Sequence, residues 1–391
     1  MADLAIKPQM PLAERLVLLD KASETINKKY GKKIVGRIGA DPELMKRLEF
    51  EFVPTASAAL NDAIGGGFPK RRCTIIAGQP GSGKTSLLLE TIAKNMEKSD
   101  FVAVWLESEK SQKKSYLDMF RIDPERFFYI DATAIENAEI VLDNLYGILG
   151  TGAADICCIN SLKCLIPKAE MDASFSEQTV ALKARLNSRM SDKFLKLVAE
   201  MNTAFVIVTH LTTDIGVRYG DNQTVSGGMA IRYWSSLTLD LRQKAVLDSD
   251  PIDRSEGMKI GVTVKKNRCV PERNPYVKLD YFVIYGEGIE TTMSTLALAI
   301  DKGICEAKGA WIYWPDKQNG EIKQKWNGRA AYREFMKEHP EALQELLNEI
   351  GGQEAISTIE ELSKEEVAAI EEEEAKIFED KKTKRKKEIT T

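Results

Sequence analysis

The chain has 391 residues, of which 43% are apolar and 29% are charged, and its 59 acidic and 55 basic residues leave a net charge of −4. This length suits two or three domains of about 150 residues each. No apolar run approaches the roughly 18 residues of a membrane helix, and the N-terminus lacks a signal-peptide pattern, so no membrane partner is expected. Six scattered cysteines without a Cys-x-x-Cys pair argue against a zinc site or a disulfide framework, and favour a reducing cytoplasm.

The N-terminal region, residues 1–45, predicts one helix and one strand. Apolar and charged residues alternate with helical spacing over residues 12–30, and Gly31 is a plausible stop. Lys33–Gly39 then predicts a short, isolated strand. Because this pair has little of its own to pack on, it either folds back on the following domain or docks on a neighbouring subunit.

Residues 46–289 predict an α/β core. The expected strands are 73–77, 101–106, 127–130, 154–159 and 204–209, and the expected helices are 113–120, 135–149 and 178–201. Strands that alternate with helices indicate a parallel sheet covered on both faces. Three further strands, at 234–242, 259–266 and 277–285, follow with little helix between them, so the sheet is expected to end in antiparallel strands.

The first of these strands runs into a phosphate-binding signature (P-loop). Its residues are Gly78, Gln79, Pro80, Gly81, Ser82, Gly83, Lys84 and Thr85, followed by Ser86 at the start of a helix. Every fixed position of G-x-x-x-x-G-K-[ST] is matched in the required strand–turn–helix context. The glycines let backbone N–H groups wrap a phosphate chain, Lys84 reaches the β- and γ-phosphates, and Thr85 holds Mg²⁺. The expected ligands are therefore ATP and Mg²⁺.

Polar residues end the neighbouring strands. Glu107 and Glu109 follow the strand at 101–106, and Asn160 follows the strand at 154–159. Side chains at the carboxyl ends of parallel strands face the crevice where phosphates lie. Either glutamate is a candidate base for activating water, and the Asn160 amide can bond a water on Mg²⁺ without carrying a charge.

Beyond residue 289 the pattern changes. Residues 290–350 predict a small α+β domain, with helices at 292–301 and 329–338 and strands at 309–314 and 321–326. Residues 351–391 are first acidic and then basic, which predicts a disordered tail.

Five stretches resemble the RecA recombinases. They are the P-loop; Glu109 with Tyr116 and residues 122–126; Asn160-Ser161-Leu162 running into Pro167-Lys168-Ala169-Glu170; Ile215-Gly216-Val217-Arg218-Tyr219-Gly220 with Gly227-Gly228; and Ile284-Tyr285-Gly286-Glu287-Gly288-Ile289. The last two are far more specific than the P-loop. The resemblance spans about residues 12–345 and implies a RecA-type P-loop ATPase core between the N-terminal element and the C-terminal domain.

The resemblance assigns roles around the nucleotide. Glu109 aligns with the glutamate that activates water, and Tyr116 with an aromatic residue that packs on adenine. Asn160 stands where the family has a Mg²⁺-organising Asp, and His210 where bacterial members have a Gln that senses the γ-phosphate, as in some phage-encoded recombinases. Lys266 and Arg268 align with basic residues that reach ATP across a subunit interface, much as an arginine finger supplied in trans does.

The same resemblance places DNA on two loops, at about 169–178 and 211–226. The implied contacts are Arg185, Ile215, Gly216, Val217, Arg218, Gly227 and Gly228. Neither loop is strongly basic, so DNA binding is implied by the resemblance and not by charge. Ile215 and Val217 are apolar residues that can wedge between bases.

The resemblance implies a DNA-dependent ATPase that forms helical filaments on single-stranded DNA and pairs that strand with duplex DNA. Two alternatives stay open. One is a nucleotide-gated filament or scaffold with little hydrolysis, which Asn160 favours. The other is a hexameric RecA-fold motor or helicase.

Overall fold

The computed structural model describes residues 10–97, 100–110, 113–174, 181–213, 223–247, 250, 252–270, 276–316 and 320–357. The chain divides into a larger unit, Met1–Val246 with Arg254–Ile289, and a smaller unit, Leu247–Asp253 with Glu290–Thr391. Nowhere in these ranges is a helix long and apolar enough to span a bilayer.

The N-terminal region holds the expected helix but not the expected strand. Helix α1 (Leu12–Tyr30) ends at Gly31, whose φ of 65° is left-handed. Residues 33–37 form no strand, and a 3₁₀ turn, η1 (Ile38–Ala40), precedes α2 (Pro42–Lys46). In the single chain the Asn27 side chain takes the backbone groups that a partner strand would need. Its Oδ1 accepts from the N–H groups of Ile34 and Val35, and its Nδ2 donates to the Val35 carbonyl.

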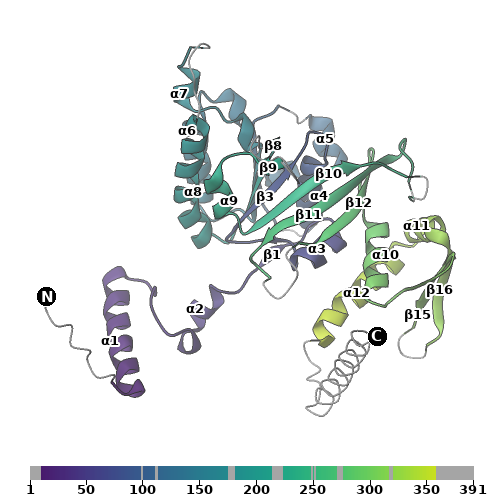
Figure 1. Ribbon diagram of the computed structural model, residues 1–391, viewed down its shortest axis with the longest axis horizontal. Helices are drawn as coiled ribbons and strands as arrows, with labels where there is room; N and C mark the ends of the chain where they lie inside the picture. The colour runs from purple at the N-terminus through teal and green to yellow at the C-terminus, as the bar shows by residue number, and fades with distance from the viewer. Residues whose placement is uncertain are drawn as a thin grey trace, which may run out of the picture. The chain divides into compact units, whose positions relative to one another are not determined.

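A nine-stranded sheet forms the centre of the larger unit, in the order β13-β12-β11-β10-β3-β7-β6-β4-β5. Its strands are β3 (Cys73–Gly78), β4 (Ala103–Glu107), β5 (Phe127–Asp131), β6 (Ile156–Asn160), β7 (Ala204–Thr209), β10 (Leu237–Lys244), β11 (Gly257–Asn267), β12 (Lys278–Ile284) and β13 (Gly288–Glu290). Figure 1 labels four of these strands, β3, β10, β11 and β12. The strands from β10 through β3 to β5 pair in parallel, and β10, β11 and β12 pair antiparallel. The expected mostly parallel sheet with an antiparallel end is confirmed.

Alternate strand residues feed two apolar cores, one on each face of the sheet. Ile76 joins one core with α3 (Ala58–Ile64) and α4 (Lys84–Met96), to which α5 (Lys114–Met119) adds partly buried residues. Ile75 joins the other core with α6 (Ala138–Leu149), α8 (Leu182–Glu200) and α9 (Met229–Trp234). Trp234 was predicted to begin a strand. It instead ends α9, because the Ser235 N–H bonds the Ile231 carbonyl and closes the last helical turn.

Short elements link these layers. They are β1 (Phe52–Val53), β2 (Phe68–Pro69), η2 (Pro124–Arg126), η3 (Ala132–Ala134), η4 (Leu162–Cys164), α7 (Lys168–Met171), β8 (Leu211–Thr213) and β9 (Gln223–Val225). Strands β8 and β9 pair antiparallel, so both ends of the second predicted DNA loop form a hairpin. The start of that hairpin follows β7 directly.

The smaller unit is α+β. It contains α10 (Thr291–Asp301), β14 (Glu306–Lys308), β15 (Trp311–Pro315), β16 (Ile322–Asn327), α11 (Gly328–Glu338) and α12 (Pro340–Ser357). The Trp314 and Trp326 rings stack, and Tyr332 packs edge-on against Trp326. Helix α12 runs through Gly351 and Gly352, so a disordered tail beginning at residue 351 was wrong for 351–357; helix-favouring residues on both sides offset the roughly 1 kcal/mol that each glycine costs. The tail from 358 onward lies outside the described residues.

Candidate nucleotide site and DNA-facing loops

The P-loop lies between β3 and α4 and is shaped to enclose phosphates. A Cβ added at Gly78 would lie 2.4 Å from the Leu241 carbonyl oxygen, and Gly83 has a left-handed φ of 78°. Lys84 crosses the loop, where its Nζ donates to the carbonyls of Gly78 (3.1 Å) and Gln79 (2.7 Å). Burial lowers the pKa of Lys84, and the nearby Glu109 charge opposes that shift. The loop therefore fits a nucleotide whose phosphates would replace these carbonyl contacts.

Oxygen atoms suited to Mg²⁺ meet beside the P-loop. Thr85 Oγ1 donates to Asn160 Oδ1 at 3.5 Å, so the two predicted metal-binding residues face each other across the start of α4 and the end of β6. Hydroxyl and amide oxygens are acceptable Mg²⁺ ligands, directly or through water. Next in sequence, Ser86 bonds the Tyr116 hydroxyl at 2.8 Å, which brings the predicted adenine-packing residue against the P-loop helix.

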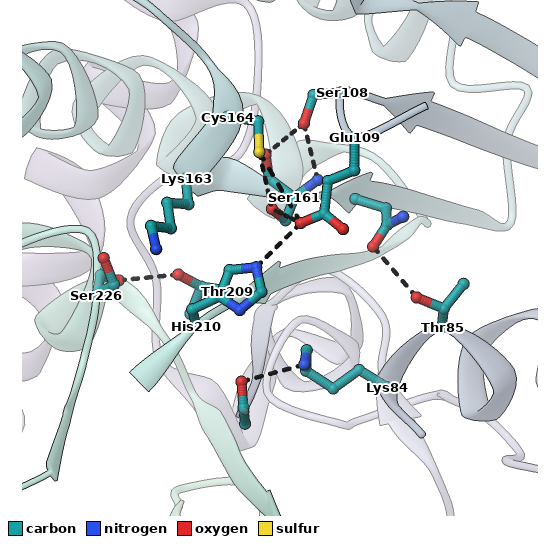
Figure 2. Close-up of polar contacts among 12 residues, drawn as sticks. Lys84, Thr85, Ser108, Glu109, Ser161, Lys163, Cys164, Thr209, His210 and Ser226 are labelled. Atoms are coloured by element: carbon teal, nitrogen blue, oxygen red, sulfur yellow. Dashed lines mark hydrogen bonds and ion pairs between the residues drawn. The ribbon is translucent and has the colours of Figure 1, made fainter. Parts of the chain in front are cut away.

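Glu109 faces the P-loop from the end of β4. Its Oε1 accepts from Ser161 Oγ and lies 3.0 Å from His210 Nε2 at the end of β7 (Figure 2). Burial raises the pKa of Glu109, but the bonds from Ser161 and His210, with the charges of His210 and Lys84, lower it more. The net pKa of Glu109 lies below its ordinary value, so the carboxylate is ionised and able to accept a proton.

Glu107 occupies a different environment from Glu109. Its side chain is 0% exposed, and its oxygens accept from Trp105 Nε1, Asn160 Nδ2 and the Glu109 N–H. The side chain of Glu109 is 26% exposed and is adjacent to the P-loop lysine. Of the two candidate bases, only Glu109 is partly exposed beside the P-loop.

The structure adds two serines that the sequence reasoning did not single out. Ser161 bonds Glu109, and Ser108 holds Ser161: Ser108 Oγ donates to the Ser161 carbonyl (2.7 Å) and accepts from its N–H (2.9 Å). Their positions in the sequence could have identified them, because Ser108 lies between Glu107 and Glu109 and Ser161 directly follows Asn160. Cys164 Sγ lies 4.0 Å from Glu109 Oε1, at the same edge of the site.

The second loop predicted to bind DNA, at about 211–226, is anchored to the strand that precedes His210. The Ser226 N–H donates to the His210 carbonyl at 3.0 Å, and Thr209 Oγ1 donates to the Ser226 carbonyl at 3.2 Å. Gly227 and Gly228 follow with φ of 113° and 90°, and the Gly227 carbonyl accepts from Asn187. The predicted contacts Ile215, Gly216, Val217 and Arg218 lie outside the described residues.

The structure describes the first loop predicted to bind DNA, at about 169–178, only as far as residue 174. Its start forms α7, and Glu170 pairs with Lys183 of α8 at 3.6 Å. Arg185 lies in the first turn of α8 and is exposed. Its guanidinium is therefore available to a phosphate near this loop.

Lys266 and Arg268 lie away from the P-loop of their own chain. In the sheet Lys266 pairs with Thr238, which pairs with Ile75, and the Arg268 N–H bonds Ser236, whose own N–H bonds the Cys73 carbonyl. Arg268 is thus level with the start of β3, roughly 16 Å along that strand from Gly78. Lys266 Nζ donates to the carbonyls of Arg232 and Tyr233 at the end of α9.

Comparison with known proteins decides the family. The RecA N-terminal domain model matches residues 17–290. Protein RecA of Bifidobacterium longum is 31% identical over 338 residues, covering 86% of this chain and 80% of the relative. Protein RecA of Thermus aquaticus is 31% identical over 332 residues, covering 84% and 92%. The chain belongs to the RecA family.

Among solved structures, the crystal structure of the RadB recombinase is similar with a TM-score of 0.47 and 16% identity, over 61% of this chain and 98% of that one. RecA family membership, from the family match and the curated relatives, gives the chain the role of an ATP-dependent DNA recombinase. The P-loop, Glu109 and the β8–β9 hairpin are the parts of this RecA family chain that bear on that role.

Proposed function

We propose that this RecA family member is a DNA-dependent ATPase that assembles on single-stranded DNA as a helical filament and exchanges that strand with a homologous duplex. The observation that carries the proposal is one run of contacts. Glu109 at the P-loop bonds His210, and the His210 backbone bonds Ser226 at the end of the β8–β9 hairpin. These two contacts connect the proposed DNA-binding loop to Glu109, the proposed base, so a change in the loop can alter the position of Glu109.

Magnesium and ATP have a defined place in this proposal. Gly78–Thr85 and Ser86 would hold the phosphates, Tyr116 the adenine, and Thr85 with Asn160 the Mg²⁺ ion. When bound, Mg²⁺–ATP supplies a transferable phosphoryl group whose oxygens are neutralised by the metal. Lys84 gives up its bonds to the Gly78 and Gln79 carbonyls to meet the phosphates. A buried ammonium is strongly attracted to an anion because burial leaves it poorly solvated.

The protein side of hydrolysis rests on Glu109. Its lowered pKa keeps the carboxylate ionised, so it can accept a proton from an attacking water. Ser161 and His210 hold it at the edge of the site. If a γ-phosphate takes the same His210 nitrogen, Nε2, that nitrogen cannot keep its full contact with Glu109, and nucleotide binding would then release the base.

Filament assembly would complete the site. Arg268 is exposed at the opposite end of the sheet from the P-loop, which suits a contact to the ATP of a neighbour. Strand β5 is the sheet edge next to β4, and its Phe128 and Tyr129 are 56% and 44% exposed. We propose that Lys33–Gly39 of one subunit docks on that edge of the next, as exposed strand edges accept extended segments.

A cytoplasmic location is part of the proposal. All six cysteines are free, and five of them are buried. Free buried thiols suit a reducing compartment.

One observation favours a second candidate, a nucleotide-gated filament with little hydrolysis. Asn160 carries no charge where the family has Asp, so it organises Mg²⁺ less strongly. Such a filament would bind ATP and assemble normally while turnover stayed near background.

The test is an ATPase assay on wild type and Lys84→Ala, with and without single-stranded DNA, alongside electron microscopy of the same samples. The proposal expects DNA to stimulate turnover in wild type, ATP-dependent filaments, and loss of both in Lys84→Ala. Filaments without stimulated turnover would favour the second candidate. Absence of both in wild type would refute the recombinase mechanism proposed here.

A further inference from the structure

Glu107 is the carboxylate to which the proposed reaction gives no role. It ends β4 level with Asn160 of β6 in the parallel ladder, and it is completely buried. Its Oε2 accepts from Trp105 Nε1 (3.0 Å) and Asn160 Nδ2 (2.9 Å), and its Oε1 from the Glu109 N–H (3.0 Å). Burying a carboxylate costs free energy unless hydrogen-bond donors surround it. Two of the donors to Glu107 are the proposed Mg²⁺ ligand Asn160 and the backbone N–H of Glu109, the proposed base.

The side-chain amide of Asn160 has a donating end and an accepting end. Glu107 Oε2 takes the Nδ2 end, so Oδ1 points toward Thr85 Oγ1, 3.5 Å away. If the amide turned over, its oxygen would face the carboxylate and two acceptors would oppose each other. The carboxylate of Glu107 thus selects one of two orientations of Asn160.

We infer that Glu107 is a positioning residue, which keeps the Asn160 oxygen toward the metal side of the nucleotide site. The inference rests on the proposed function, because it requires Mg²⁺–nucleotide beside Thr85 and Asn160. The bond from the Glu109 N–H to Glu107 also fixes the backbone of Glu109, the proposed base.

The experiment is a double-mutant cycle in the full-length protein, with wild type, Glu107→Gln, Asn160→Asp and the double variant. The dissociation constant of a fluorescent ATP analogue is measured in Mg²⁺ and again in EDTA, so the ratio isolates the contribution of the metal. Glu125→Gln, which removes a charge from an exposed glutamate, is the matched control. Melting temperatures are recorded for every variant.

In the wild-type background, Glu107→Gln should reduce the Mg²⁺ contribution by about tenfold or more, as loss of residues that orient metal ligands does. Affinity in EDTA should not change. The introduced glutamine offers both a donor and an acceptor, so it no longer selects the amide orientation. In the Asn160→Asp background the same change should be harmless or favourable. There the glutamine amide can donate to the new carboxylate, and the repulsion between two facing carboxylates is relieved.

A merely structural role for Glu107 predicts another pattern. Melting temperatures would fall in both backgrounds, while the Mg²⁺ contribution would stay within about twofold of wild type, the scatter of additive sites. That result, or an equal loss in both backgrounds, overturns the inference. If Glu107→Gln does not fold, a double variant that binds Mg²⁺–nucleotide about tenfold more weakly than Asn160→Asp overturns it as well. Wild type with equal affinity in Mg²⁺ and EDTA would instead refute the proposed function.

Discussion

The two ends of the central sheet differ in how their charged groups are held. At the carboxyl ends of β3, β4 and β7, Lys84 bonds the loop carbonyls and Glu109 bonds Ser161 and His210. At the other end Arg268 is exposed, although the backbone beneath it is fixed in the sheet. One half of the proposed hydrolytic site is assembled within the chain, and the other half is proposed to be presented to a neighbouring subunit.

The largest expected effect comes from breaking the assembled half. Glu109→Gln keeps the size of the side chain and removes the base, so DNA-stimulated ATPase should fall by up to about 10⁴-fold. Affinity for nucleotide should change little, because the P-loop is intact. Steady-state turnover and a binding titration check this, with Glu125→Gln as the charge-matched control. Turnover within tenfold of wild type would remove Glu109 from its role.

The next effect tests the outward half. Arg268→Ala should lower turnover by about 10³-fold, a typical loss for a finger supplied from a neighbour. Its melting temperature should stay near that of wild type, because the side chain is exposed. Lys266→Ala is expected to lower both turnover and the melting temperature, since Lys266 bonds the carbonyls that end α9. Equal turnover in Arg268→Ala and wild type would place the trans contact elsewhere.

Mixing the two variants sharpens the comparison further. The Glu109→Gln subunit keeps an intact Arg268, and the Arg268→Ala subunit keeps an intact Glu109. In an equal, randomly ordered mixture about a quarter of the sites combine both, so turnover should recover to roughly a quarter of wild type. Each variant alone at the same concentration is the control. A mixture as inactive as its components would show that the two halves do not meet between subunits.

The smallest effect is a shift in pH dependence. Ionised Glu109 is the active form, so turnover falls as pH drops through its pKa. Ser161→Ala removes one of the bonds that lower this pKa, so the pKa rises and the acid limb moves to higher pH. A pH–rate profile checks this, with Thr151→Ala, an exposed hydroxyl bonded locally, as the control. An unmoved acid limb would mean that Ser161 does not tune the base.

The sequence predicts the central sheet well because its signals are local. Strands β3 and β7 are buried on both faces, and strands of this kind appear in the sequence as continuous apolar runs. The P-loop was recognised from spacing alone. The antiparallel end of the sheet followed from strands that have no helices between them.

Other features could not be read from local signals. The strand expected at 33–39 is absent from the single chain because the side chain of Asn27, a residue outside the expected strand, bonds its backbone. Glu107 and Glu109 differ in environment because of their bonds to Asn160 and Ser161, which lie some fifty positions further along the chain. Two glycines, Gly351 and Gly352, indicated a break that the flanking helix-favouring residues override. In each case residues outside the segment itself decide its structure.

The hold of Asn27 on Ile34 and Val35 has a consequence for assembly kinetics. A docking segment whose backbone groups are already bonded must release them before each subunit adds, so filament growth should be slower than subunit collision. Exchanging these hydrogen bonds for strand bonds changes the free energy little. The gain on docking would then come from covering Ile34 and Val35, which are 39% and 38% exposed. Free subunits would persist at low concentration and join only above a threshold.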